Sequence, residues 1–152
     1  MAGEIDRKKL IVPAMAGVYE AFSPYSYAFM RFAAGAILVP HGWQKLIGGT
    51  AMATAKGMAA KGFPAPELLA YLVGFVELVG AACLAVGLLT RFWAAALWIQ
   101  MAVIIIWFTG PNGYFWSKLG YEFPLLWLLL FTAIFFRGGG RYSLDHRLGR
   151  EF

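Results

Sequence analysis

The feature that most constrains this chain is residues 27–49, an apolar stretch that is long enough to cross a bilayer but also carries charge. A hydrocarbon core of about 30 Å requires about 20 apolar residues in a helix. This stretch contains Arg31, His41, Gln44 and Lys45. A charge at mid-depth costs roughly 2.5–3.5 kcal/mol on insertion scales, so such side chains usually face other protein or water. The helix therefore requires partner helices from the rest of the chain.

The composition is typical of an integral membrane protein. The 152 residues are 61% hydrophobic and 14% charged, whereas a soluble domain is about 45–50% apolar and about 25% charged. One small bundle is all that this length allows. The single Cys83 excludes an intrachain disulfide. The net charge of +5 comes from cations at the edges of apolar segments, which indicates membrane topology and not nucleic-acid binding.

Hydropathy and turn residues predict an all-α, integral membrane four-helix bundle. Pro24 is expected in the first turn of the first helix, a position that suits proline, and residues 50–66 are expected to be a polar connection. The expected spans cover about residues 24–47, 67–89, 92–108 and 121–136.

The domain organisation follows from these spans. Residues 1–22 are expected to form an amphipathic segment on the membrane surface, residues 23–137 the transmembrane domain, and residues 138–152 a basic tail. Four spans place both termini on one side, together with most of the Lys and Arg residues, so the positive-inside rule makes that side cytoplasmic. The basic residues expected on the side of the termini are Arg7, Lys8, Lys9, Arg91, Arg137, Arg141, Arg147 and Arg150. Those expected on the other side are Lys45, Lys56, Lys61 and Lys118.

Polar residues inside the spans mark a candidate site. Glu77 lies about 15 Å from the outer end of the second span, and Gln100 is the one polar residue inside the third. Gly74 and Gly80 flank Glu77 at intervals of three residues, and such small residues allow helices to approach closely in lipid. We therefore expect Glu77 to face the bundle, with Arg31 or His41 as its partner.

Two interpretations of these charges remain open. In the first, they are pairs that fix the helix arrangement and perform no chemistry. In the second, Glu77 and His41 exchange protons in a pocket that opens to the outer face and is lined by Trp43, Tyr121 and Glu122. A quinone headgroup requires such proton-handling groups, because its reduction takes up protons as well as electrons.

Other chemistry has little support in the sequence. The two histidines, His41 and His146, fall on opposite sides of the predicted membrane, so we expect no metal or haem site. The sequence has no CxxC motif, phosphate-binding glycine loop or serine nucleophile elbow. We expect no tightly bound cofactor. A redox role would need electrons from a partner or a diffusible substrate.

Six short motifs occur in order along the chain and together resemble the DoxX family. They begin with the stretch around His41 and include Glu77, Arg91 and the pair Tyr121–Glu122. The resemblance covers about residues 27–146. The motifs are HGWQKL at 41–46, GFP at 62–64, Glu77, GLLTR at 87–91, YE at 121–122 and GRYSLD at 140–145.

This resemblance implies a four-helix protein of the bacterial inner membrane with a redox-linked role. The family is related to the membrane subunit of thiosulfate:quinone oxidoreductase, so the chain is expected to be a quinone-interacting oxidoreductase or the membrane subunit of one. Its electrons would come from a sulfur compound or a partner protein, and quinone would be a diffusible cofactor. Whether the chain is an enzyme by itself stays open. The alternatives are a non-catalytic anchor or assembly subunit of a redox complex, and a small-solute carrier, for which four spans are few without a homo-oligomer.

The candidate residues have distinct expected roles. Glu77 and His41 would handle protons, and Arg91, Gly74 and Gly80 would be structural. The candidates for binding substrate or quinone are Lys45, Trp43, Tyr121, Glu122 and Arg31.

Overall fold

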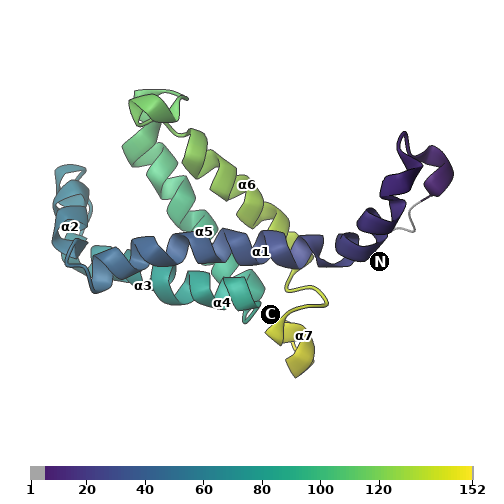
Figure 1. Cartoon of the computed structure of the whole chain (residues 1–152). Coiled ribbons are helices and arrows are strands. Elements are labelled where there is room, and N and C mark those ends of the chain that lie inside the picture. Colours follow the sequence, from purple (N-terminus) through teal and green to yellow (C-terminus); the bar gives the residue numbers. More distant parts are fainter. Residues whose placement is uncertain (1–5, 152) are drawn as a thin grey trace.

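The structure is a computed structural model that describes residues 6–151, and within them it contains helices and turns but no strand (Figure 1). Two long helices each contain a π-helical turn. The first turn, η3, joins α3 to α4, and the second, η4, extends α5. The helices are α1 (Ala16–Leu46), α2 (Ala51–Ala60), α3 (Pro66–Phe75), η3 (Val76–Gly80), α4 (Ala81–Val86), α5 (Thr90–Val103), η4 (Ile104–Thr109), α6 (Glu122–Arg137) and α7 (Leu144–Leu148). Short 3-10 turns lie at Arg7–Lys9, Pro13–Met15, Gly110–Asn112 and Trp116–Lys118.

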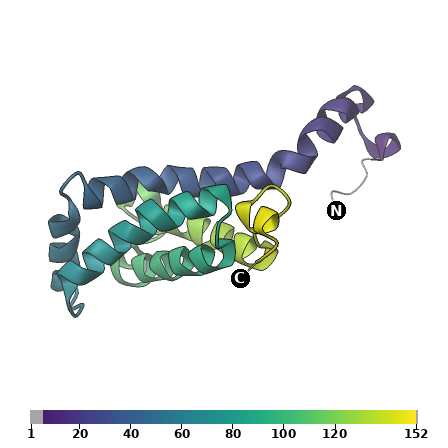
Figure 2. The same cartoon turned by 90° about the horizontal axis from the view of Figure 1, so that it is seen from below.

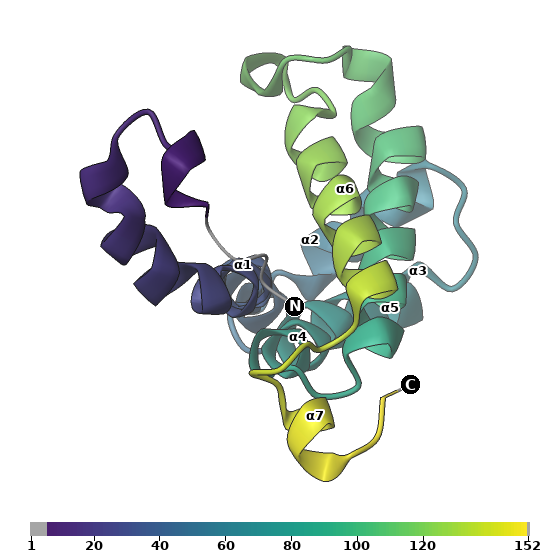
Figure 3. The same cartoon turned by 90° about the vertical axis from the view of Figure 1, so that its right-hand side faces the viewer.

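The long helices form two antiparallel pairs. α1 runs alongside α3 and α4, and α5 pairs with α6 in a hairpin that inclines away from α1 toward its loop end (Figures 1 and 3). The start of α1 and the C-terminal segment lie at the end of the bundle opposite α2 (Figure 2). The two helix pairs are thus inclined to each other (Figure 1).

A core of small and branched side chains holds the helices together. Ala34 of α1 and Ala81 of α4 are almost fully buried, which lets these helices approach closely. The core cluster is Ala34, Leu38, Ala81, Leu84, Ala94, Leu97, Met101, Phe131 and Ile134. A second, smaller cluster of Ala55, Met58 and Ala70 lies where α2 covers α3.

The outer surface is apolar along the bundle. Large side chains such as Phe29, Leu68, Ile99 and Leu126 are more than half exposed, and apolar surface of this kind marks contact with lipid or protein. Two continuous helices are long and apolar enough to cross a membrane, Pro66–Val86 and Thr90–Asn112. The other two predicted spans lie in α1, which has 31 residues, and in α6, which has 16.

One local expectation was wrong. Pro24 does not begin the first helix: α1 begins at Ala16 and contains both Pro24 and Pro40. Proline removes a backbone donor and bends a helix without necessarily ending it, and the first part of α1 turns away from the bundle (Figure 2). Residues 50–66 connect α1 to α3 and contain α2, whose Ala, Met and Lys residues are good helix formers.

The C-terminal segment has structure of its own. It folds back as α7 and docks on the bundle through Asp145. Residues 1–5 of the predicted surface segment and residue 152 of the tail lie outside the described residues.

Candidate functional site

A buried polar triad lies between α1, η3 and α5. The Nζ atom of Lys45 lies 2.5 Å from Oε2 of Glu77, and the side-chain amide of Gln100 donates to Oε1 of Glu77 at 2.6 Å. Glu77 is 4% exposed and Gln100 is 8% exposed. Each oxygen of the carboxylate therefore accepts from a different helix, and the Lys45 charge compensates the buried negative charge.

Close helix contact brings these groups together. A Cβ atom added at Gly35 would lie 2.6 Å from the backbone nitrogen of Ala85, and one at Gly42 would lie 2.6 Å from the carbonyl carbon of Glu77. α1 therefore packs directly against the backbone of η3 and α4. Because Lys45 follows Gly42 by three residues, it lies on the same face of α1 and reaches the Glu77 carboxylate.

The π-helical turn η3 gives Glu77 its place in the bundle. Gly74, before the turn, packs against Lys45 and Leu46 of α1, whereas Gly80, at its end, packs against Trp93 of α5. The helix contacts α1 on one side and α5 on another, and Glu77 lies in the turn where it can contact both. Single π turns within α-helices are frequent at functional sites.

The triad lines an apolar cavity of about 340 Å³. Both π turns contribute to its wall, Val76 and Glu77 from η3 and Ile104 and Phe108 from η4. The remaining lining residues come from α1, α2, α3, α5 and the α2–α3 loop: Lys45, Thr54, Met58, Phe63, Leu69, Leu72, Val73, Ala96, Ile99, Gln100 and Val103. Its volume and its few polar groups are typical of a site for a small apolar ligand.

One acceptor of the triad is unsatisfied. The Oε1 atom of Gln100 is buried and, within residues 6–151, has no hydrogen-bond partner. Its amide nitrogen is committed to Glu77. A buried acceptor without a partner costs about 1–3 kcal/mol, so a donor from water or a ligand would be stabilising here. Sequence reasoning left Gln100 out of the candidate site, although it was the one polar residue inside its span.

Arg31 does not pair with Glu77, and the expected partnership is wrong. Its guanidinium is 2% exposed and donates to three backbone carbonyls, those of Leu84 at 2.8 Å, Ala85 at 3.1 Å and Tyr142 at 2.7 Å. The first two are carbonyls in the last turn of α4, where regular helical partners run out. Arg31 therefore ties α1 to α4 and to the C-terminal segment, at the end of the bundle remote from α2.

The C-terminal segment completes this junction. Both carboxylate oxygens of Asp145 accept backbone N–H groups at the start of α5, from Leu89 at 2.7 Å and Thr90 at 2.9 Å, and the Thr90 hydroxyl donates at 2.6 Å. The GLLTR and GRYSLD motifs thus dock on each other and form a structural junction. Arg91 of the first motif pairs with Glu151 at 3.4 Å.

The other predicted site residues lie away from the triad. His41 is exposed on α1, so the expectation that it partners Glu77 is wrong, and Trp43 is 55% exposed. Glu122 accepts the backbone N–H of Trp116 at 3.1 Å, and Tyr121 packs edge-on against Tyr114. These last two residues order the α5–α6 loop and do not line the cavity. Within the described residues, no group of three or more His, Cys, Asp or Glu side chains could hold a metal.

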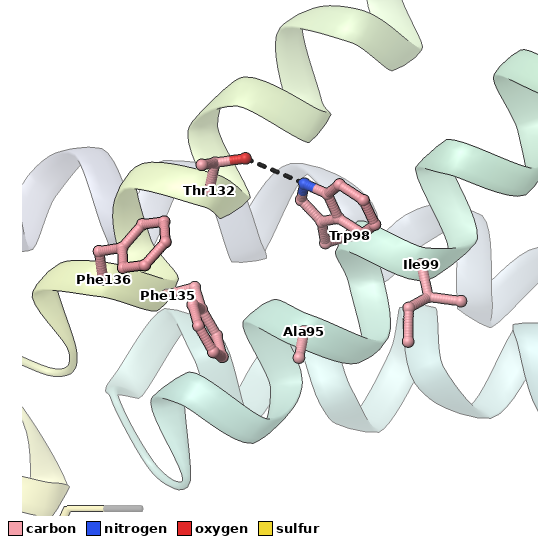
Figure 4. Close-up of a pocket in the computed structure, with 6 residues that line it drawn as sticks. All are labelled: Ala95, Trp98, Ile99, Thr132, Phe135 and Phe136. Carbon is pink, nitrogen blue, oxygen red and sulfur yellow. Dashed lines mark hydrogen bonds between the residues drawn. The ribbon is translucent and has the colours of Figure 1, made fainter.

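A second apolar groove of about 380 Å³ lies between α5 and α6 (Figure 4). The Trp98 indole donates to Thr132 Oγ1 at 2.9 Å across the two helices. The lining residues are Ala95, Trp98, Ile99, Thr132, Phe135 and Phe136. No charged residue lines it.

The long apolar helices, the exposed apolar surface and the buried charge pair define a helical membrane protein. Comparison with known proteins agrees. The DoxX family model matches residues 26–110, more than half of the chain. This chain belongs to the DoxX family.

Two curated relatives cover most of the chain. An uncharacterized protein of Haemophilus influenzae is 31% identical over 135 residues, which are 87% of this chain and 97% of the relative. An uncharacterized membrane protein of Mycobacterium tuberculosis is 28% identical over 149 residues, 91% of each chain. No solved structure matches this chain.

Proposed function

We propose that this protein crosses the bacterial inner membrane four times, with both termini in the cytoplasm. Four antiparallel passes, an apolar outer surface and termini at the same end support this arrangement. α6 is the shortest pass, at 16 residues or about 24 Å. A pass of that length is accommodated by local bilayer thinning and by aromatic anchors such as Trp116 and Phe136 at its ends.

We further propose that the cavity beside Glu77 binds the headgroup of a quinone, in a redox-linked role. The observation that carries this proposal is the buried Lys45–Glu77–Gln100 triad in the wall of an apolar cavity of about 340 Å³. Apolar walls suit the ring and its tail, and the triad supplies a cationic donor, a carboxylate and a vacant acceptor. The residues that line the cavity therefore fit a quinone headgroup.

The residues have separable roles in this proposal. A bound quinone supplies a two-electron, two-proton acceptor, and the electrons come from a partner protein or a small sulfur compound. Lys45 would donate a hydrogen bond to a quinone carbonyl oxygen and would stabilise negative charge there. Glu77, when protonated, would supply a proton that quinone reduction takes up, and as a carboxylate it would recover one. Gln100 would hold the Glu77 carboxylate, and its Oε1 atom would accept a hydrogen bond from a hydroxyl of the reduced form.

The test is a binding titration of the full-length protein, purified in mild detergent, with a short-chain ubiquinone and with menadione. The expected result is saturable binding that weakens at least tenfold in Lys45→Met and in Glu77→Gln. Lys45→Met removes a direct contact to the quinone, and Glu77→Gln removes the carboxylate that orients Lys45. Thr132→Val is the matched control because it alters the other groove and leaves the triad intact. Circular dichroism and gel filtration verify that the variants fold.

Two outcomes would contradict the quinone proposal. One is that neither quinone binds the wild-type protein, and the other is that the triad variants bind as tightly as the wild type. Co-purification of a stoichiometric redox partner, with no quinone on this chain, would indicate the anchor function.

A further inference from the structure

A polar cavity of about 530 Å³ lies at the end of the bundle that carries both termini, remote from the triad. It lies between the start of α1, the end of α6 and the segment that follows α6. Its polar lining consists of two arginines and several hydroxyl groups: Ser23, Ser26, Tyr27, Arg137, Arg141 and Tyr142.

Both arginines of this cavity are without an acidic partner. Within residues 6–151, neither Arg137 nor Arg141 forms an ion pair, and the Glu151 carboxylate is engaged with Arg91. Each guanidinium instead lies over a tyrosine ring, Arg137 at 4.4 Å from the centroid of Tyr27 and Arg141 at 5.8 Å from that of Tyr142. Stacking on an aromatic face orients a guanidinium and leaves N–H donors available to an anion.

The polar cavity adjoins an apolar groove. A second cavity of about 360 Å³ shares Ser26, Tyr27 and Arg137 with the first and continues along α1 and α6 past Met30 and Ala133. α1 and α6 are linked at this level by the Tyr27 hydroxyl, which donates to the Gly138 carbonyl at 2.5 Å. A cationic, hydroxyl-rich cavity therefore leads into an apolar groove that follows the helices.

We propose that this pair of cavities binds an anionic phospholipid, with its phosphate between Arg137 and Arg141 and an acyl chain along the α1–α6 groove. The inference rests on the four-pass arrangement proposed above, which puts this end at the cytoplasmic leaflet, where anionic lipids are concentrated. Free phosphate has the same anionic group as the lipid headgroup, but it has no acyl chain to fill the apolar groove. The lipid is therefore the ligand that both cavities fit.

The test is native mass spectrometry of the full-length protein released from detergent in the presence of dioleoyl-phosphatidylglycerol, dioleoyl-phosphatidylcholine or glycerol 1-phosphate. The expected result is one retained phosphatidylglycerol, no comparable retention of phosphatidylcholine, and no displacement by glycerol 1-phosphate. Arg137→Gln and Arg141→Gln should each weaken retention about fivefold, and the double variant roughly thirtyfold. Lys118→Gln, at the opposite end of the bundle, should retain the lipid like the wild type.

Three outcomes would overturn the proposal. Equal retention of both lipids would indicate non-specific lipid contact. Full displacement by glycerol 1-phosphate would indicate a free-phosphate site. Unchanged retention in the double variant would remove the arginines from the site. Quinone titration of the double variant separates this proposal from the previous one, because its triad is intact and its quinone affinity should be that of the wild type.

Discussion

A Cβ atom at Gly42 would lie 2.6 Å from the carbonyl carbon of Glu77, so α1 and the π turn meet backbone to backbone at this point. This contact sets the geometry of the triad. Lys45 lies one helical turn farther along the same face of α1, and its ammonium lies 2.5 Å from the Glu77 carboxylate. The buried charge pair therefore depends on a residue that has no side chain.

Gly42→Ala should separate α1 from the π turn. The added methyl group meets backbone atoms, which no rotamer change can relieve, so we expect a loss of about 1–3 kcal/mol and a lower melting temperature by circular dichroism. Gly17→Ala is the control, since nothing lies within 4 Å of a Cβ atom at Gly17, and its greater helix propensity should leave the protein equally or more stable. Identical melting of Gly42→Ala and wild type would contradict the close contact.

The Lys45–Glu77 pair should show strong coupling in a double-mutant cycle. Removing one partner leaves an uncompensated buried charge, which costs about 3–5 kcal/mol. Lys45→Met and Glu77→Gln should therefore each destabilise the protein, and the double variant should be less destabilised than the sum of the two. Thermal unfolding of all four proteins in one detergent measures the coupling. Strictly additive effects would show that the pair makes no direct interaction in solution.

The position of Glu77 in the bundle followed from the sequence, but its partners did not. A buried carboxylate amid small residues is predictable from the cost of charge in lipid. The partners depend on the π turn, which inserts an extra residue into the helical repeat. Counting Gly74, Glu77 and Gly80 along a regular helix places all three on one face, whereas Gly74 faces α1 and Gly80 faces α5. No local signal in the sequence distinguished this turn from ordinary helix.

The four long helices were predictable because their apolar runs are bounded by Gly, Pro and charged residues. The junction formed by Arg31 and Asp145 was not predictable, because it joins residues far apart in the chain. The sequence predicts a carboxylate partner for Arg31, because it is a charge within a predicted span. Arg31 instead binds the carbonyls of Leu84, Ala85 and Tyr142. Carbonyl groups at a helix end carry no sequence signature.

Asp145→Ala should release the C-terminal segment from the bundle. It removes three accepted hydrogen bonds, two of them from backbone N–H groups at the start of α5. Loss of an N-terminal cap costs about 0.5–2 kcal/mol, and residues 138–151 should become susceptible to limited proteolysis. Arg147→Ala is the control, because the Arg147 side chain makes no hydrogen bond or ion pair within the described residues. Equal cleavage rates of Asp145→Ala and wild type would contradict the docking.

The proposed topology predicts which fusions are active in a bacterial host. A green fluorescent protein fused after residue 152 should fluoresce, because it folds in the cytoplasm. Alkaline phosphatase inserted at Gly113, in the loop between η4 and α6, should be active, because that loop faces the periplasm in the proposed orientation. Phosphatase activity at the C-terminus alone would reverse the orientation, and activity at both positions would show that α6 does not cross the membrane.

The most direct test of the quinone proposal is photo-crosslinking with an azido-quinone, followed by mass spectrometry of the labelled peptides. The proposed site predicts labels on cavity residues such as Met58, Phe63 and Phe108, and their loss in Lys45→Met. Labels confined to Trp98, Phe135 and Phe136 in the α5–α6 groove, or labelling that excess unmodified quinone does not suppress, would contradict the proposal.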